Sequence, residues 1–378
     1  MLGKPPYQYL EKEKAIRFMK KASIITIHVG FNFGSVLQTV ATAVVLQELG
    51  YKPTIVNYIP DRVTYRRYFK EGLKDFRKLI RRVLYFPFHL KNVAAYNGFL
   101  ATHTNLSQPI YPGDDFATKC PVADVYVTGS DQVWNSIHNE GFDGHYFFDD
   151  IAGANKIAFA SSIGREKIDD EELHLIKERL SKYKAVSVRE SSAVKILNSI
   201  GIGSTLVLDP TLLLDKDQWL KIAGERIEKS PYLLIYTPYN IVDEELIYRE
   251  ARKMAKKQGL KIITFSWTHR KNRYADYTYR YARPEEFLSL MYFADFVITN
   301  SFHGTAFSIN LNKQFVVYQP SAFSTRITSL IEIVGLRSRL VSADTHITAL
   351  PEINYSQVNK LLDAEREKSM DFLRKALG

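Results

Sequence analysis

The sequence predicts an α/β protein with two Rossmann-like domains that face a cleft. Three observations support this fold class. Short apolar runs alternate with helical patterns along most of the chain, which is typical of parallel sheets. The runs form two series that separate at Asp209 and Pro210, where a residue before proline is kept out of helical space. The length of 378 residues, 46% of them hydrophobic, is enough for two cores.

The first domain is expected at residues 23–210, after an N-terminal extension of residues 1–22. Its first apolar run is followed by a glycine-rich loop and by a helix over 36–49, which Gly50 closes. Six apolar runs predict its strands: 23–29, 53–58, 124–128, 156–161, 185–188 and 204–208.

The second domain is expected at residues 211–345. Its predicted strands are 232–236, 261–266, 295–299 and 314–318, with helices at 243–258, 284–293 and 304–312. Residues 346–378 have a charged helical pattern, and we expect this C-terminal helix to pack back across both domains. Ligands of open parallel sheets bind beyond the carboxyl ends of the strands, so the loops after the strands are the candidate functional segments.

Basic residues are concentrated in one segment. The chain has 51 Lys and Arg against 41 Asp and Glu, a net charge of +10. Residues 62–91 hold ten of the basic residues against Glu71 and Asp75, which leaves an excess of only two elsewhere. Apolar residues from Leu73 to Leu84 recur at helical spacing, so this basic helical insert is typical of a helix that binds an anionic membrane surface. A helix packed on the core with solvated charges is the alternative, and no recognition motif supports nucleic-acid binding.

Cysteine use and hydropathy indicate the compartment. Cys120 is the single cysteine, which excludes an internal disulfide and a zinc site with several cysteines. The first 22 residues lack the apolar core of a secretory signal, and no apolar run approaches the length of a membrane span. We therefore expect a cytoplasmic protein that is at most peripheral on the inner face of the membrane.

The most informative loop spans residues 298–311, where a buried strand turns into an apolar helix. The N-terminus of such a helix attracts anions. Ser301 and Thr305 offer hydroxyl groups, Gly304 allows close approach of a phosphate, and His303 can exchange a proton near neutral pH. An equally open alternative is that Ser301 or Asn300 caps the helix and His303 packs against the sheet.

Two loops of the first domain carry polar and aromatic groups suited to a sugar. Residues 28–39 match neither a dinucleotide fingerprint nor a P-loop, and residues 127–136 combine a carboxylate with an indole ring. The candidate sugar-binding residues are Asn32, Ser35, Gln38, Asp131 and Trp134. Helix capping and core packing are the alternatives in both loops.

Arginines follow three apolar runs, at Arg165, Arg189 and Arg326. Arginine recognises carboxylate or phosphate with two parallel hydrogen bonds, although a solvated surface position is common. Asp215 and Asp217 have the spacing of a metal–nucleotide motif, but they fit a helix start equally well. We expect neither a metal nor a bound cofactor.

Several of these motifs, in this order, resemble the polysaccharide pyruvyl transferase family over about residues 23 to 340. The most specific blocks are GSDQVWN at residues 129–135 and TNSFHGTAFS at residues 299–308. The resemblance implies a GT-B-like pair of domains. It also implies transfer of the enolpyruvyl group of phosphoenolpyruvate to a sugar of a surface-polysaccharide precursor, with formation of a pyruvate ketal and release of phosphate.

The resemblance assigns roles to the candidate residues. It implies that His303 is the general acid and base, and that the donor-binding residues are Arg189, Ser301, Gly304, Thr305 and Arg326. The acceptor would face Asn32, Ser35, Gln38, Asp131 and Trp134. Phosphoenolpyruvate is then a co-substrate, and the expected glycan acceptor is lipid-linked. One departure is Arg283, which stands before Pro284 where the family is expected to have glycine. A glycosyltransferase that uses a sugar nucleotide in the same cleft is the alternative function.

Overall fold

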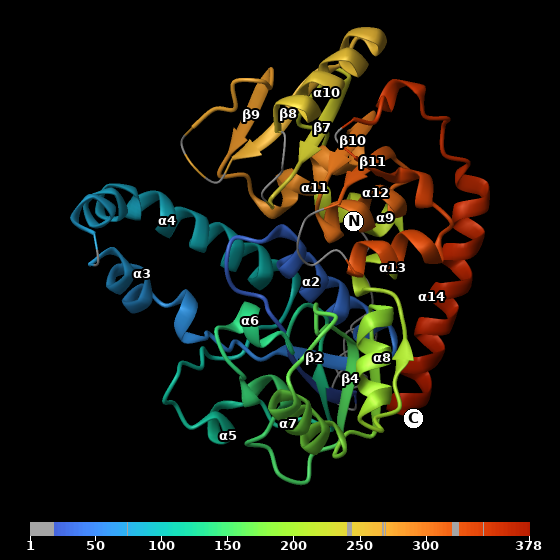
Figure 1. Ribbon diagram of the computed structural model, residues 1–378. Helices are drawn as coiled ribbons and strands as arrows, with labels where there is room; N and C mark the ends of the chain where they lie inside the picture. The colour runs from blue at the N-terminus through green and yellow to red at the C-terminus, as the bar shows by residue number, and fades with distance from the viewer. Residues whose placement is uncertain are drawn as a thin grey trace, which may run out of the picture.

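The computed structural model contains two six-stranded parallel sheets with helices packed around them (Figure 1). It describes residues 19–73, 75–239, 244–266, 268, 270–319, 325–342 and 344–378. The predicted α/β architecture with two parallel sheets is thereby confirmed. Of the expected N-terminal extension, residues 1–18 lie outside the described residues.

The first sheet has the strand order β2-β1-β3-β4-β5-β6, and neighbouring strands run parallel. Its strands are β1 (Lys20–Ile25), β2 (Tyr51–Ile55), β3 (Val125–Thr128), β4 (Lys156–Ser161), β5 (Ala185–Val188) and β6 (Thr205–Leu206). Strand β1 begins three residues before the predicted strand, because Lys20 already pairs with Tyr51 at the sheet end. The apolar residues after Ile25 belong to the loop that leads to the site.

The second sheet has the order β12-β11-β10-β7-β8-β9 and is also parallel. Its strands are β7 (Tyr232–Tyr236), β8 (Lys261–Ser266), β9 (Tyr277–Arg280), β10 (Phe296–Thr299), β11 (Gln314–Tyr318) and β12 (Leu340–Val341). Strands β9 and β12 were not expected, since both are short edge strands without a continuous apolar run.

Helices connect the strands in both domains. In the first domain they are α2 (Phe33–Glu48), α3 (Tyr65–Gly72), α4 (Phe76–His103), α5 (Phe116–Lys119), α6 (Ser136–Asn139), α7 (Asp170–Leu180) and α8 (Ser191–Ser199). Then follow α9 (Lys216–Ala223), α10 (Glu244–Gln258), α11 (Pro284–Phe293), α12 (Phe302–Asn310), α13 (Thr325–Ile333) and α14 (Tyr355–Leu377). Helix α12 begins two residues before the predicted helix, because Ser301 provides its N-cap.

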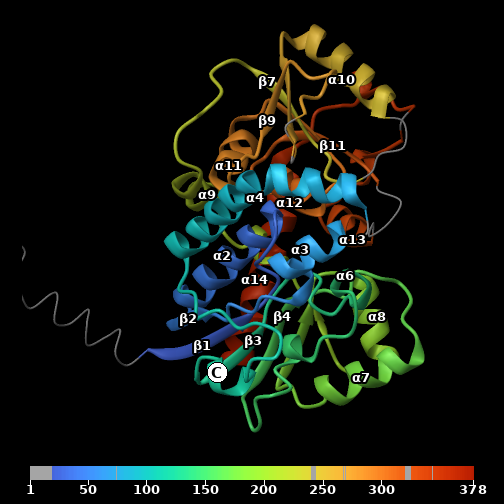
Figure 2. The same cartoon turned by 90° about the vertical axis from the view of Figure 1, so that its left-hand side faces the viewer.

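Helices α3 and α4 form a helical hairpin, residues 65–103, that projects from the first domain (Figure 1). In Figure 2 this hairpin faces the viewer. It contains most of the predicted basic insert, and α4 continues twelve residues beyond the insert to His103. Among the described helices, none is long and apolar enough to cross a membrane.

Helix α14 runs along both domains (Figure 1). Near its start, the Tyr355 hydroxyl donates to the Ser308 carbonyl of α12. Near its end, the Tyr51 hydroxyl of β2 donates to the Leu377 carbonyl at 3.0 Å. The domains also touch through aromatic rings, since Phe33 of α2 stacks on Phe287 of α11 with ring centroids 4.4 Å apart. These contacts hold the N-terminus of α2 next to that of α12.

Candidate functional site

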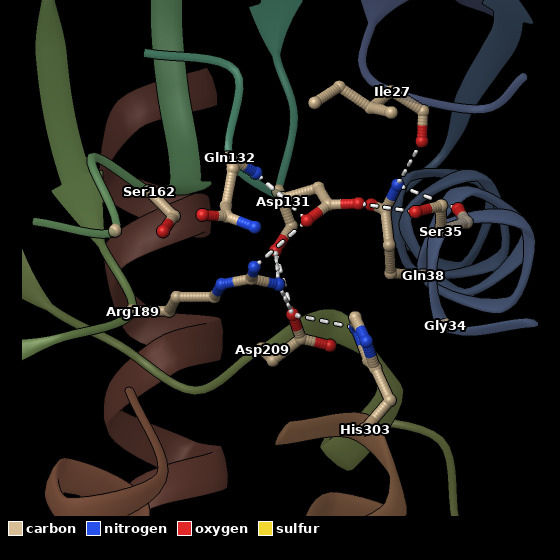
Figure 3. A network of polar contacts seen from close by, with 12 residues as sticks. Ile27, Gly34, Ser35, Gln38, Asp131, Gln132, Ser162, Arg189, Asp209 and His303 are labelled. Atoms are coloured by element: carbon tan, nitrogen blue, oxygen red, sulfur yellow. Dashed lines mark hydrogen bonds and ion pairs between the residues drawn. The ribbon is translucent and has the colours of Figure 1, made fainter. Parts of the chain in front are cut away.

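A chain of buried polar side chains crosses the junction of the two domains (Figure 3). The Ser35 hydroxyl donates to Asp131 at 2.6 Å, and Asp131 also accepts from Arg189 Nη2 at 3.1 Å. Arg189 Nη1 is paired with Asp209, whose Oδ2 lies 3.8 Å from His303 Nε2. Side chains of the first sheet thus approach His303, which belongs to the second domain.

Strand ends place these residues together. Asp131 follows β3, Arg189 directly follows β5, Asp209 follows β6 and His303 follows β10. Carboxyl ends of parallel strands lie at one edge of a sheet, so each of the two sheets directs its loops to the junction. Asp131 has φ of 77°, a left-handed conformation that is uncommon for a residue with a side chain.

Asp131 and Asp209, the two aspartates of the polar chain, are ionised at neutral pH. Burial by itself raises the pKa of Asp209, but the adjacent Arg189 charge outweighs it and holds that pKa well below its ordinary value. The charge of His303 and the hydrogen bonds from Thr211 act in the same direction. At Asp131 the Arg189 and His303 charges also outweigh burial and lower the pKa to about 2. Arg189 therefore serves to keep two buried carboxylates charged.

His303 lies on the first turn of α12 and is 5% exposed. Gly34, on the first turn of α2, makes this position possible. A Cβ atom built on Gly34 would lie 1.9 Å from His303 Nδ1, so a larger residue there would displace the imidazole ring. Gly34 is not among the expected site residues. The sequence feature that marks Gly34 is its position at the start of a helix, directly after Asn32 and Phe33.

The expected phosphate-binding residues are engaged within their own helix. Ser301 is the N-cap of α12, and its Oγ accepts from the Gly304 N–H group at 3.3 Å. Thr305 Oγ1 donates to the Ser301 carbonyl. A Cβ atom on Gly304 would lie 2.2 Å from Thr299 Oγ1, so Gly304 allows close packing on β10. This geometry is that of the helix cap, the alternative that the sequence leaves open.

Two of the three arginines come together at Phe302, the residue before His303. The guanidinium groups of Arg189 and Arg326 lie 4.7 Å and 5.7 Å from the centre of the Phe302 ring. Both arginines are buried, and they come from different domains. Arg165 is not part of this group, because it pairs with Glu172 of α7. Arg189 was expected to bind the donor, but here its guanidinium is shared between two aspartates.

The expected acceptor residues divide into two groups. Ser35 and Asp131 belong to the polar chain, whereas Asn32 accepts hydrogen bonds from two N–H groups of α2 as its N-cap. Gln38 is fully buried and donates to Thr26 Oγ1 and to the Ile27 carbonyl. Trp134 is 3% exposed and stacks on Phe147, so its ring face is packed in the core and closed to a sugar. Its position differs from the expected one because the apolar indole ring is buried beneath the loop.

A cavity of about 780 Å³ lies between the helical hairpin and the ends of β1 and β2. Its lining includes His28, Phe31, Asn57, Arg62, Tyr65 and Tyr96. The ring of His28 is held by Asn57 and by the Thr26 carbonyl, each at 3.1 Å. Aromatic and amide groups of this kind bind sugar rings. Phe31, which lines the cavity, stands three residues before Gly34 in the sequence. The sequence gives no hint of this cavity, because distant segments form its walls.

All residues that form the polar chain lie within one matched region. Residues 32–321 match the model of the polysaccharide pyruvyl transferase family. The chain belongs to this family. The match includes Gly34, the first-domain residues of the polar chain, and His303. The name of the family describes transferases and implies a polysaccharide as the acceptor. A comparison with curated protein sequences gives no significant match.

Solved structures resemble this pyruvyl transferase family member in fold. UDP-GlcNAc 2-epimerase from Methanocaldococcus jannaschii is 12% identical, with a TM-score of 0.51, and the match covers 91% of this chain and 92% of the epimerase. UDP-GlcNAc 2-epimerase from Neisseria meningitidis bound to UDP-GlcNAc is 10% identical, with a TM-score of 0.50. That match covers 95% of this chain and 99% of the epimerase. At such identities the likeness shows the fold alone, a GT-B-type pair of Rossmann-like domains.

The spacing of Asp215 and Asp217 has a structural explanation in this family member. Asp215 is the N-cap of α9 and accepts from the N–H groups of Asp217 and Gln218. Gln218 Oε1 accepts in return from the Asp215 N–H group, which completes a capping box. Within the part of the chain that the structure describes, no three His, Cys, Asp or Glu side chains are grouped as metal ligands.

Proposed function

We propose that this protein transfers the enolpyruvyl group of phosphoenolpyruvate to a sugar of a surface-polysaccharide precursor, forms a pyruvate ketal and releases phosphate. The observation that carries the proposal is the His303–Asp209 pair at the domain junction of a member of this family. A junction between two domains can bring a small anionic donor to a glycan that the other domain holds.

The reaction needs controlled proton transfer. A proton adds to C3 of phosphoenolpyruvate while a sugar hydroxyl attacks C2, where positive charge develops, and the hydroxyl loses its proton. The C–O bond to phosphate then breaks, and a second hydroxyl of the same sugar attacks C2 and closes the ketal. The second hydroxyl proton leaves with the phosphate, so the atoms and charges balance without an oxidant or reductant.

His303 can serve both proton transfers in this scheme. An imidazole ring can donate to C3 and accept from a hydroxyl, which contributes roughly 10²–10⁴-fold to a rate. The ionised Asp209 carboxylate lies 3.8 Å from Nε2 and faces the charge that forms when the ring takes up a proton. Arg189 acts on Asp209 and is therefore a positioning residue.

The donor anion requires positive charge near His303. Arg326 is buried beside Phe302, and the positive end of the α12 dipole lies at the same place. We assign Arg326 to the carboxylate or phosphate of phosphoenolpyruvate. We assign the acceptor sugar to the cavity beside α2, where Asn57 and Arg62 line the wall on the first-domain side.

Purified protein incubated with phosphoenolpyruvate and with galactosyl or mannosyl acceptors tests the reaction. We expect release of inorganic phosphate together with a sugar product that carries the mass of one pyruvate ketal. Release of a nucleoside diphosphate from a sugar nucleotide, without use of phosphoenolpyruvate, would identify a glycosyltransferase and overturn the proposal.

The His303→Asn variant tests the assigned proton donor. We expect kcat to fall by roughly 10²–10⁴-fold, because asparagine cannot exchange protons near neutral pH. His174→Asn is the matched control, since His174 is exposed on α7, and it should retain the wild-type rate. Equal rates for His303→Asn and wild type would remove His303 from the mechanism.

A further inference from the structure

One face of the helical hairpin is covered by contacts between its two helices. Tyr68 and Phe69 of α3 pack against Phe86 of α4, with ring centroids 6.0 Å and 4.9 Å apart. Arg82 donates to the Tyr68 carbonyl, and its guanidinium lies 4.9 Å from the centre of the Tyr68 ring. One side of α4 is therefore covered by α3.

The opposite side of the hairpin exposes large apolar side chains. Leu73, Phe76, Val83 and Leu84 are 70%, 74%, 55% and 66% exposed. Seven large apolar side chains in the described part of the chain are more than half exposed, and these four lie within twelve residues. Phe76, Ile80, Val83 and Leu84 lie on one stripe of α4 by their spacing, and Leu73 follows the end of α3 just before α4 begins. The predicted amphipathic helix is present, and its apolar stripe faces solvent rather than the core.

Basic side chains border this apolar stripe. Arg77, Lys78 and Arg81 are exposed on α4, and Lys70 is exposed on α3. Asp75, the acid at the start of α4, accepts from two N–H groups as its N-cap. An apolar stripe bordered by cations complements the surface of an anionic bilayer, where phosphate groups lie above acyl chains. An apolar protein partner would not require this charge.

The cavity at the base of the hairpin explains why a membrane would be useful. Tyr65 of α3 and His89 of α4 line the same cavity as His28 at the end of β1. A lipid-linked glycan that enters this cavity would have its lipid on the hairpin side. The cavity wall at Phe31 lies three residues before Gly34, the residue that contacts His303, so the cavity lies between the hairpin and the start of α2.

We propose that the helical hairpin binds an anionic lipid bilayer through its apolar stripe and the bordering cations, and presents the cavity to a membrane-borne acceptor. The nature of the acceptor rests on the proposed function, whereas binding to lipid does not. Phe76, Val83 and Leu84 enter the boundary between headgroups and acyl chains. Arg77 and Arg81 contact lipid phosphates.

Sedimentation of the full chain with unilamellar vesicles tests this binding. We expect binding to phosphatidylcholine vesicles that contain about one third phosphatidylglycerol, and at least about 10-fold weaker binding to pure phosphatidylcholine. Arg77→Glu/Arg81→Glu should weaken binding to anionic vesicles at least about 10-fold. Phe76→Ser/Leu84→Ser should weaken it by a similar factor, because transfer of the apolar side chains is lost.

Matched controls separate this surface from general charge and hydropathy. Lys216→Glu/Lys221→Glu changes two exposed cations on α9, and Val122→Ser/Ile137→Ser changes two exposed apolar residues elsewhere. Both controls should bind vesicles like wild type. Equal binding by the hairpin variants and wild type, or absence of vesicle binding by wild type, would overturn the proposal.

Two further measurements distinguish the remaining outcomes. Sedimentation velocity would show a dimer that Phe76→Ser/Leu84→Ser dissociates if a second copy covered the stripe, and that result would also overturn the proposal. Pyruvyl transfer to a water-soluble acceptor should be unchanged in all hairpin variants. Failure of that reaction in wild type would refute the proposed function and leave the vesicle result standing.

Discussion

Gly34 is the residue on which the position of His303 depends most directly. In Gly34→Ala, the added Cβ would lie 1.9 Å from Nδ1, so the imidazole ring must leave its present position relative to Asp209. We expect kcat/KM to fall by about 10²-fold or more, in line with the loss of an oriented acid and base. Gly203→Ala is the control, because open space surrounds Gly203. A wild-type rate for Gly34→Ala would show that this contact is unnecessary.

The lowered pKa of Asp131 makes the stability of the folded protein depend on pH. Its pKa of about 2 in the folded protein lies below the ordinary value of 3.8, so the unfolded chain binds a proton first as pH falls. Stability from this shift is complete above about pH 4 and is lost as pH falls towards 2. It amounts to about 2 kcal/mol.

The variant Asp131→Asn tests this dependence. Because asparagine does not titrate, the difference in unfolding free energy between wild type and variant should be larger at pH 7 than at pH 3. Urea unfolding followed by circular dichroism at both values measures it. Ser23→Ala, remote from the polar chain, should give a difference that is independent of pH. A constant difference for Asp131→Asn would contradict the assigned ion pair.

Individual side chains show where sequence reasoning succeeds. Spacing after strands identified Asp131, Arg189 and His303, because residues that follow parallel strands gather at one edge. It could not show that Arg189 pairs with Asp131 and Asp209, since such bonds depend on the distance between separate loops. Trp134 has the composition of a sugar platform, but burial of its ring is decided by Phe147, which is distant from any local pattern.

At the scale of the element, Ser301 has two possible roles on α12. Its hydroxyl is engaged with the Gly304 N–H group, so we expect it to act as a cap. Ser301→Ala should then lower the unfolding free energy by about 1 kcal/mol and Ser301→Gly by only a few tenths. Thermal unfolding measures this ranking. The KM for phosphoenolpyruvate should be close to the wild-type value in both variants. An equal, large rise of KM in both would instead assign the hydroxyl to the donor.

Elements were predictable where the pattern was continuous. The buried strands β4, β7 and β11 and the helix α11 have the predicted limits, because long apolar runs or a proline mark them. Strands β9 and β12 are edge strands that need only one partner, so they form without such a run. The extent of α4 was also missed, since its C-terminal half is fixed by burial of residues such as Tyr96 and Phe99.

For the whole molecule, two parallel sheets and a cleft follow from the order of apolar runs. How the sheets meet does not, because the contacts that join them are far apart in sequence. Phe33 stacks on Phe287 across about 250 residues, and Gly34 admits His303 across a similar separation. The geometry of the His303–Asp209 pair therefore depends on contacts that fix the two domains in one relative position.

Arg366 of α14 is such a contact, and its removal should loosen the junction. Nε donates to the Leu212 carbonyl and Nη2 to Asn310 Oδ1, each at 2.7 Å, so one side chain joins the segment between the domains to the end of α12. In Arg366→Ala these buried acceptors lose a charged donor, which costs about 2–3 kcal/mol. Scanning calorimetry should show a melting temperature lower by a few degrees.

The same helix provides the control. Arg374 pairs with Glu367 and Asp371 on the surface of α14, so Arg374→Ala should leave the melting temperature nearly unchanged. Because Arg366 lies outside the polar chain, its removal should lower kcat/KM only by letting His303 and Asp209 separate, and added glycerol or lower temperature should restore part of the rate. If Arg366→Ala melts and reacts like wild type, α14 does not set the relative position of the domains, and the aromatic contact between Phe33 and Phe287 must suffice.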